Sequence, residues 1–271
     1  MPETKWAVAV TTAPRRDCTL TQCLESLSVA GWKPTVFAEP GSTLTNYPTY
    51  WNTERKLGVW NNWVNSVRVS MMNPDWDVLM TVQDDSYFHP DSKDFVERCF
   101  WPREDCGFIS LYTPKHYTIR RDGEYRPVGI NRIHTKSLWG ACALVWPRPI
   151  LELVMQHPLI EKWKGAGPWR KNKGETKEQL QKRKQSFYEK RTNDPSLIAN
   201  SDTAIGKLMN RLGRSMWFVD PSPVEHIAVF STLKKHGSNN GKRNCWRKAD
   251  HSLPLDFQVP IKQTVELVCK Q

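Results

Sequence analysis

Two adjacent carboxylates, Asp84 and Asp85, follow an apolar run at 76–82 (WDVLMTV), whose composition predicts a buried β-strand. Neighbouring carboxylates at a strand end repel each other unless a cation or hydrogen-bond donors compensate their charge. A divalent cation such as Mg²⁺ or Mn²⁺ often does so, because hard cations prefer oxygen ligands. The pair therefore predicts a metal site. The alternative is a capping or loop pair that holds no metal.

The segments that must position this pair alternate between strand and helix patterns. Such alternation predicts an α/β fold with a mostly parallel sheet flanked by helices, in which ligands collect at the carboxyl ends of the strands. Thr11, Thr12, Glu39 and the acidic pair all fall at such ends. The predicted strands are 6–12, 35–38, 76–82, 107–112, 141–146 and 216–220, and the predicted helices are 19–30, 58–71, 149–156, 177–190 and 201–212.

Several short motifs follow one another along residues 6–230. A strand is followed by the basic loop at Arg15, a second strand ends at Glu39, and QDDS stands at 83–86. WGAC follows at 139–142, Ser201-Asp202 opens a helix, and His226 comes late. In this order the motifs resemble the GT-A (Rossmann-like) glycosyltransferases, in particular the inverting enzymes that use nucleotide-diphosphate sugars. The resemblance implies a single catalytic domain over 1–271.

The resemblance also implies roles for individual residues. Asp85 and His226 would hold a divalent metal, Mn²⁺ or Mg²⁺, and a UDP-sugar would be the donor substrate. Asp202 would be the general base, although Ser201 stands where the family has Glu. From the residues alone, Asp202 also suits a helix N-terminus, and a lone His is often structural. The residues implied to bind the donor are Thr11, Thr12, Arg15, Glu39, Asn62, Asp84, Trp139 and Gly140.

The formal net charge of +11 is concentrated in two segments. Residues 162–191 carry a surplus of eight positive charges and residues 234–248 a surplus of six, so the remainder is near −3. Such charge runs either form a solvated face or bind a polyanion. The polyanion would be a sugar nucleotide or a nucleic acid. We expect residues 1–112 to bind the nucleotide sugar and 113–232 to bind the acceptor, with a basic insertion at 162–195. A basic C-terminal segment follows at 233–271.

Aromatic residues stand among the cations of both basic segments, which suits phosphate contacts combined with base stacking. In its expected compact, soluble form, the chain also resembles in type the viral, including bacteriophage, glycosyltransferases that modify hydroxymethylpyrimidines in DNA. The leading prediction is therefore transfer of a hexose, glucose by preference, to 5-hydroxymethylcytosine or 5-hydroxymethyluracil. Alternatives are a soluble enzyme with a glycan or protein acceptor, and an inactive nucleic-acid-binding module. The residues predicted to contact nucleic acid are Lys182, Arg183, Lys184, Lys234 and Lys235.

The seven cysteines are odd in number and form no C-x-x-C pair, so neither a zinc knuckle nor a secreted disulfide framework is indicated. We expect a reducing, cytoplasmic setting, which would be the host cytoplasm for a viral protein. No apolar run reaches about 18 residues, so no membrane span is expected. Trp60, Trp63, Trp76 and Trp101 are expected in the core, whereas the loop context of Trp139 favours a site role.

Overall fold

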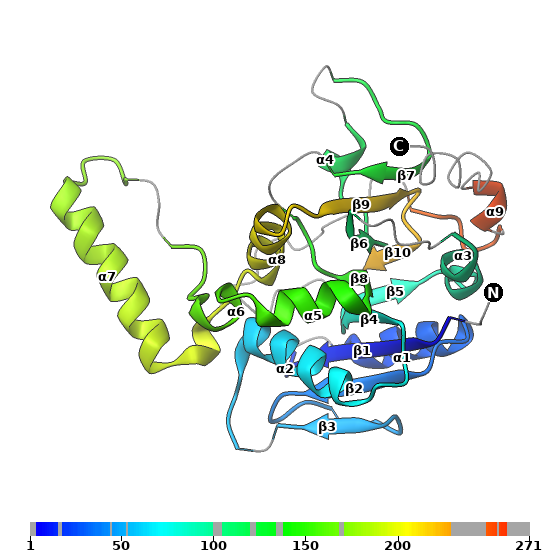
Figure 1. Ribbon diagram of the computed structural model, residues 1–271, viewed down its shortest axis with the longest axis horizontal. Coiled ribbons are helices and arrows are strands. Elements are labelled where there is room, and N and C mark those ends of the chain that lie inside the picture. Colours follow the sequence, from blue (N-terminus) through cyan, green and yellow to red (C-terminus); the bar gives the residue numbers. More distant parts are fainter. Residues whose placement is uncertain are drawn as a thin grey trace.

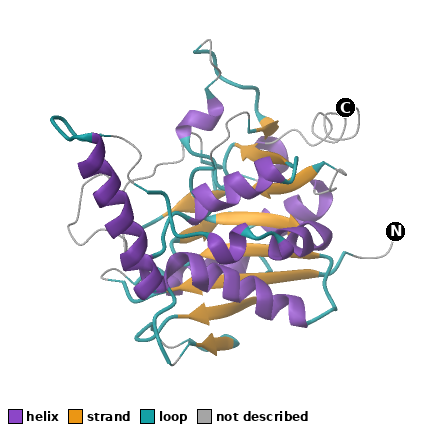
Figure 2. Ribbon diagram, turned by 60° about the vertical axis from the view of Figure 1, so that its left-hand side comes forward, coloured by secondary structure: helices purple, strands orange, loops and turns teal. Residues whose placement is uncertain are grey.

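The computed structural model describes most of the chain, and its architecture is shown in Figures 1 and 2. A large mixed sheet lies between two layers of helices, and one long helix stands off from the body. Among the described residues, no helix has the length and apolar character needed to cross a membrane. The described residues are 4–15, 18–43, 45–52, 54–99, 105–119, 123–133, 138–167, 171–228, 248–253 and 255–258.

Eight strands form the main sheet, in the order β3-β2-β1-β4-β8-β6-β9-β7, and β10 pairs with β5 in a separate ribbon. Six strands of the main sheet run in one direction, while β8 and β7 are antiparallel to their neighbours. The strands are β1 (Trp6–Thr12), β2 (Pro34–Ala38), β3 (Thr49–Trp51), β4 (Val78–Gln83), β5 (Ser86–Phe88), β6 (Cys106–Ser110), β7 (Gly129–Arg132), β8 (Ala143–Pro147), β9 (Ser215–Asp220) and β10 (Val224–His226).

Helices cover both faces of the sheet and bury two separate apolar clusters. One cluster contains side chains of α1 and α3, and the other contains side chains of α2, α5, α6 and α8. Successive residues of β1 contribute to opposite clusters, as the two-residue period of a strand requires. The helices are α1 (Leu20–Val29), α2 (Gly58–Met72), α3 (Ser92–Cys99), α4 (Lys115–Thr118), α5 (Arg148–Gln156), α6 (Leu159–Lys162), α7 (Lys177–Asn193), the 3₁₀ turn η1 (Pro195–Leu197), α8 (Ser201–Arg211) and α9 (Leu255–Gln258).

The expected α/β fold with a mostly parallel sheet flanked by helices is confirmed, with shifts of one to three residues at element ends. Trp60, Trp63 and Trp76 are buried, as expected, whereas Trp101 lies outside the described residues. The direction of β8 was not foreseen, because an apolar run carries no information on strand polarity. Its position is fixed at its start, where the carbonyl of Cys142 accepts the N–H of Gln83 at 2.8 Å.

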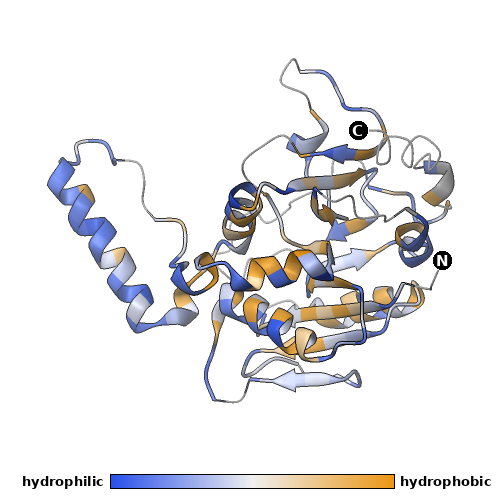
Figure 3. Cartoon of the chain, in the orientation of Figure 1, coloured by the Kyte–Doolittle hydropathy of each residue, from blue (hydrophilic) through white to orange (hydrophobic). Residues whose placement is uncertain are grey.

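The basic insertion contains α7, which lies apart from the sheet in Figure 1 and is largely hydrophilic in Figure 3. Among its 17 residues, all of which the structure describes, none is buried. A capping box starts the helix: the Thr176 hydroxyl accepts the N–H of Gln179, whose side chain accepts the N–H of Thr176. The helix is therefore stabilised by local interactions more than by a core.

The start of α2 depends on Gly58. Its φ of +80° lies in the left-handed region, and a Cβ atom there would lie 2.1 Å from the carbonyl oxygen of Ser196. The N–H groups of Leu57 and Gly58 donate to the two carboxylate oxygens of Glu39 at 2.8 and 2.7 Å. The end of β2, the start of α2 and the η1 turn therefore meet at one glycine.

We predict that Gly58→Ala destabilises the protein by about 2–5 kcal/mol, since it combines a left-handed alanine with a backbone clash. Gly213→Ala is the matched control, because Gly213 also has a positive φ but its added Cβ would meet nothing within 4 Å. We expect the control to lose only about 1–2 kcal/mol. Urea unfolding at pH 7 measures both losses, and equal losses would contradict the close approach at Ser196.

Candidate active site

The carboxyl ends of β1 and β4 lie side by side and carry the first group of polar residues. Thr11 pairs with Gln83 in the sheet, and the N–H of Asp84 donates to the carbonyl of Thr11 at 3.2 Å. The chain then turns at Asp84 and Asp85 before entering β5. Both carboxylates are buried. The sequence motif therefore stands in a tight turn at the sheet edge where the resemblance placed it.

The ribbon of β5 and β10 brings a late segment of the chain to this turn. His226 pairs with Ser86, and the N–H of Ile227 donates to the carbonyl of Asp85 at 2.8 Å. The ring atom Nε2 of His226 lies 3.1 Å from Oδ2 of Asp85. Asp85 and His226, the two expected metal ligands, are thus in direct contact.

Arg15 forms ion pairs with both carboxylates of the turn. Its Nη1 lies 3.0 Å from Oδ2 of Asp85, and its Nη2 makes a short contact with Oδ1 of Asp84. The Thr12 hydroxyl donates to the other oxygen of Asp84 at 2.6 Å. The sequence analysis assigned Arg15 to the donor, but its guanidinium is engaged by the acidic pair. The partly buried charge of Arg15 reduces the repulsion that suggested a metal, although one positive charge compensates only half of two carboxylates.

Burial disfavours the charged form of Asp84, Asp85 and Arg15, whereas their contacts with one another change the pKa of each group in a different direction. For Asp85, the hydrogen bond from His226 and the charge of Arg15 outweigh burial and lower the pKa to about 2. For Asp84, burial and the neighbouring Asp85 charge raise the pKa despite the contacts with Arg15 and Thr12. The two carboxylates raise the pKa of Arg15 against the effect of its own burial. Asp85 is therefore the carboxylate that stays ionised most firmly.

Three buried polar atoms of Arg15, Asp85 and His226 have no hydrogen-bond partner among the described residues. They are Nε of Arg15, which is a donor, and two possible metal-binding atoms, Oδ1 of Asp85 and Nδ1 of His226. Ligand atoms of Asp85, His226 and Cys142 lie within 4.8 Å of one another. Carboxylate, imidazole and thiol groups can all bind a divalent cation, and Oδ1 of Asp85 and Nδ1 of His226 lack partners among the described residues. Sequence analysis missed Cys142 because it reads as an ordinary core residue before an apolar strand.

Glu39 and Asn62, both expected to bind the donor, bond to the backbone in this structure. Glu39 receives the two N–H groups at the start of α2, as described above, and is buried. The Asn62 amide donates to the carbonyls of Phe37 at 3.1 Å and Thr12 at 3.4 Å, which ties the ends of β2 and β1 to α2. Thr11 donates to the carbonyl of Val82 at 3.2 Å. Polar residues at strand ends serve the backbone here, and their types alone did not distinguish this from a ligand contact.

The loop before β8 carries an exposed aromatic side chain. Trp139 is 57% exposed, although tryptophan is usually buried, and its ring meets His116 edge-on at 5.2 Å between centroids. The backbone N–H of Trp139 donates to the Tyr117 hydroxyl at 2.6 Å, which fixes the loop. Gly140 has a φ of +73°, and a Cβ atom there would lie 2.7 Å from the ring of Tyr112. Glycine at 140 is therefore required for packing.

Asp202 lies in the first turn of α8, after Asn200 in a left-handed conformation with a φ of 63°. Its Oδ1 accepts the N–H of Thr203 at 2.7 Å, and its side chain is half-buried. Burial is the main cause of the raised pKa of Tyr117, and the charges of Asp202 and Cys142 act in the same direction.

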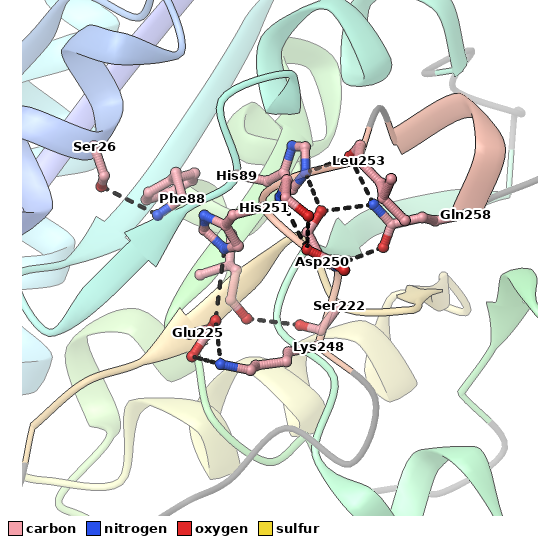
Figure 4. Close-up of polar contacts among 12 residues, drawn as sticks. Ser26, Phe88, His89, Ser222, Glu225, Lys248, Asp250, His251, Leu253 and Gln258 are labelled. Carbon is pink, nitrogen blue, oxygen red and sulfur yellow. Dashed lines mark hydrogen bonds and ion pairs between the residues drawn. The ribbon is translucent and has the colours of Figure 1, made fainter.

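The C-terminal segment supports β10 from outside, as Figure 4 shows. His89 Nε2 lies 2.9 Å from the carbonyl oxygen of Asp250 and 3.1 Å from that of Leu253. Glu225, the neighbour of His226, pairs with Lys248 at 3.3 Å. Glu225 therefore contacts the C-terminal segment, whereas its neighbour His226 contacts Asp85.

The structure describes three of the five residues that are expected to contact nucleic acid. Lys182, Arg183 and Lys184 lie on α7, but Arg183 pairs through two nitrogens with Glu175 at 2.8 Å each. The ion pair joins Arg183 to a residue just before the helix, and the assignment of Arg183 to nucleic acid stays a prediction. Lys234 and Lys235 lie outside the described residues.

No family model and no curated protein matches this chain. Among solved structures, A197 from STIV is 12% identical, with 92% of this chain and 96% of that chain covered and a TM-score of 0.39. HddC from Yersinia pseudotuberculosis is 10% identical, with coverages of 57% and 80% and a TM-score of 0.36. Mannosyltransferase PcManGT from Pyrobaculum calidifontis, in complex with GDP-Man and Mn²⁺, is 9% identical, with coverages of 54% and 46% and a TM-score of 0.36. At these values the likeness carries no argument about function.

We predict that Arg15→Met destabilises the protein by about 3–5 kcal/mol, because it leaves two buried carboxylates without their cation. Adding Asp84→Asn to this variant should recover part of the loss, since one buried charge is then removed. Arg68→Met is the control: Arg68 pairs with Glu161 at the surface, where about 0–1 kcal/mol is expected. Urea unfolding at pH 7 measures all three, and equal losses for Arg15→Met and Arg68→Met would contradict the buried ion-pair network.

Proposed function

We propose that this protein is a glycosyltransferase that uses a nucleotide-diphosphate sugar and a divalent cation, Mn²⁺ or Mg²⁺. One observation carries the proposal: a buried acidic turn at the carboxyl edge of parallel strands meets His226 from a distant segment, and both Asp85 and His226 keep an unpartnered buried atom. Ligands of α/β proteins gather at this edge. The donor set suits a cation that itself binds a diphosphate.

Transfer breaks the bond between the anomeric carbon and the diphosphate oxygen, and the electron pair leaves with the diphosphate. When bound, a divalent cation supplies electrostatic stabilisation of that leaving group. Asp85 and His226 would hold it. Arg15 and Thr12 fix the carboxylate of Asp84, so that the turn is ordered before the donor arrives. The exposed ring of Trp139 provides an apolar surface for a sugar face.

Asp202 is proposed as the general base. In an inverting reaction the acceptor hydroxyl oxygen attacks the anomeric carbon from the face opposite the diphosphate, and its proton passes to the base. The half-buried position of Asp202 at the start of α8 leaves one carboxylate oxygen beyond the contact with Thr203.

For the finer specificity we propose a UDP-hexose, by preference UDP-glucose, as the donor and a hydroxymethylated pyrimidine in DNA as the acceptor. Support comes from α7, a basic helix that stands off from the fold with none of its described residues buried. A base inside a duplex is inaccessible to the site, so the acceptor nucleotide would be flipped or the duplex distorted. Glycan or protein acceptors, and a module that binds nucleic acid without transfer, are the other outcomes of the tests below.

The proposal predicts sugar transfer from one member of a nucleotide-sugar panel to hydroxymethylated DNA and none to plain DNA, detected by nucleoside mass spectrometry. EDTA should abolish transfer and Mn²⁺ or Mg²⁺ should restore it. Asp202→Asn should lower the transfer rate by about 10²–10⁴-fold, because an amide cannot accept the proton.

Donor binding by Asp202→Asn, measured by calorimetry, should stay at the wild-type level and is the control for folding. Transfer at the wild-type rate by this variant would remove Asp202 from the mechanism. A protein that binds DNA but consumes no sugar nucleotide from the panel would instead support the binding module.

We predict that Lys182→Ala combined with Lys184→Ala weakens DNA binding at low salt. The slope of the logarithm of the binding constant against the logarithm of the salt concentration should become shallower by at most about 0.9 per lost phosphate contact. Hydrolysis of the donor without acceptor should not change. The matched control replaces Lys33 and Lys93, which lie before β2 and on α3, far from α7. Equal effects of the two double variants would assign the charge of α7 to a solvated face.

A further inference from the structure

Cys142 stands at the junction between the acidic turn and β8, and the structure fixes its backbone on both sides of that turn. Its carbonyl accepts the N–H of Gln83 at 2.8 Å, from the residue before Asp84. The same carbonyl accepts the hydroxyl of Ser86 at 3.1 Å, from the residue after Asp85. The cysteine is fully buried. The acidic turn therefore cannot move away from Cys142 without breaking both hydrogen bonds.

The cysteine sulfur lies close to ligand atoms of Asp85 and His226. Sγ of Cys142, an oxygen of Asp85 and a ring nitrogen of His226 lie within 4.8 Å of one another. Oδ1 of Asp85 and Nδ1 of His226 lack hydrogen-bond partners among the described residues, although buried polar atoms nearly always have one. Arg15 contacts only the other oxygen, Oδ2, of Asp85. The side of the carboxylate that bears Oδ1 is left for another cation.

We propose that Cys142 is a third protein ligand of this metal site, so that the site is a mixed oxygen, nitrogen and sulfur centre. This inference rests on the proposed metal-dependent function and refines it. Three protein ligands leave positions for a substrate, as in catalytic zinc sites. A thiolate selects borderline cations such as Zn²⁺ and Co²⁺, whereas Mg²⁺ prefers oxygen ligands. On binding, the S–H bond breaks, its proton goes to solvent, and a sulfur–metal bond forms.

Cys23 offers a matched comparison in the same neighbourhood. It is fully buried on α1, and its thiol donates to the carbonyl of Gln83 at 3.8 Å, so it too lies beside the acidic turn. Burial, assisted by the charges of Asp84 and Asp85, raises its pKa. Cys23 is not in the group with His226. Closeness to the carboxylates alone therefore does not make a cysteine a ligand of this centre.

The test is titration with Co²⁺ under reducing conditions, followed by absorption spectroscopy. A cysteine thiolate bound to Co²⁺ gives a near-ultraviolet charge-transfer band, which oxygen and nitrogen ligands do not. We expect the band at one equivalent in the wild-type protein and in Cys23→Ser, and its loss in Cys142→Ser with at least about tenfold weaker Co²⁺ binding. Zn²⁺ should remove the wild-type band by displacing Co²⁺, whereas a large excess of Mg²⁺ should not.

A band that persists in Cys142→Ser, or Co²⁺ binding to the wild-type protein without a band, would overturn the proposal. Absence of Co²⁺ binding would do the same. Cys142→Ala is a second variant if Cys142→Ser fails to fold, and the Zn²⁺ and Mg²⁺ competition uses the wild-type protein alone. The sugar-transfer assay separates this result from the proposed function: transfer restored by Mg²⁺ without any cobalt–thiolate band contradicts only the cysteine ligand. A cobalt–thiolate band without transfer from any donor contradicts only the glycosyltransferase.

Discussion

The guanidinium of Arg15, buried against two carboxylates, is the interaction on which the rest of the site depends. Asp84 and Asp85 occupy a turn that must be tight, because β4 and β5 adjoin it on either side, and both side chains are buried there. Isolated buried carboxylates would take up protons. Arg15 keeps the turn charged, and together with Thr12 it fixes Asp84. One positive charge for two carboxylates leaves the site able to take a further cation.

The sheet edge that holds this charge is reinforced by polar residues that bond to backbone. Glu39 caps α2, Asn62 joins the ends of two strands to the same helix, and the carbonyl of Cys142 receives donors from both sides of the acidic turn. Such contacts cost little in conformational freedom once the fold has formed, and they hold the turn in place. His226 reaches the turn because β10 pairs with β5. His89, which follows β5, bonds to the carbonyls of Asp250 and Leu253 and so ties the C-terminal segment to this ribbon. The geometry of the centre is thus set by backbone pairing more than by the loop itself.

The sequence predicted the large elements because each is an apolar run or a helical period long enough to be recognised. The three-residue strands β3, β5 and β10 were not predicted, since three residues show no period, yet β10 is the strand that places His226. Residue types at strand ends indicated a polar edge but not the partners of each side chain. Arg15 is compatible with a phosphate contact or with a counterion, and its ion pairs with Asp84 and Asp85 could not be read from the sequence. Cys142 belongs to the WGAC motif and to the predicted strand at 141–146, but it was given no ligand role, because a cysteine in an apolar strand is typical of a core.

The helix α7 lies outside the site around Arg15, and it must be stabilised in another way. A helix with no buried residue gains nothing from the hydrophobic core. Isolated helices of this length are marginal in water, and α7 relies on its capping box and on the ion pair between Arg183 and Glu175. At its other end, the Arg191 guanidinium stacks on the Phe187 ring at 3.5 Å, next to Gly165. These contacts order the helix but leave most of its lysines facing solvent. A surface that is kept helical and basic while contributing no core is suited to a partner that supplies negative charge. DNA phosphates provide such charge at regular spacing, whereas a neutral glycan does not.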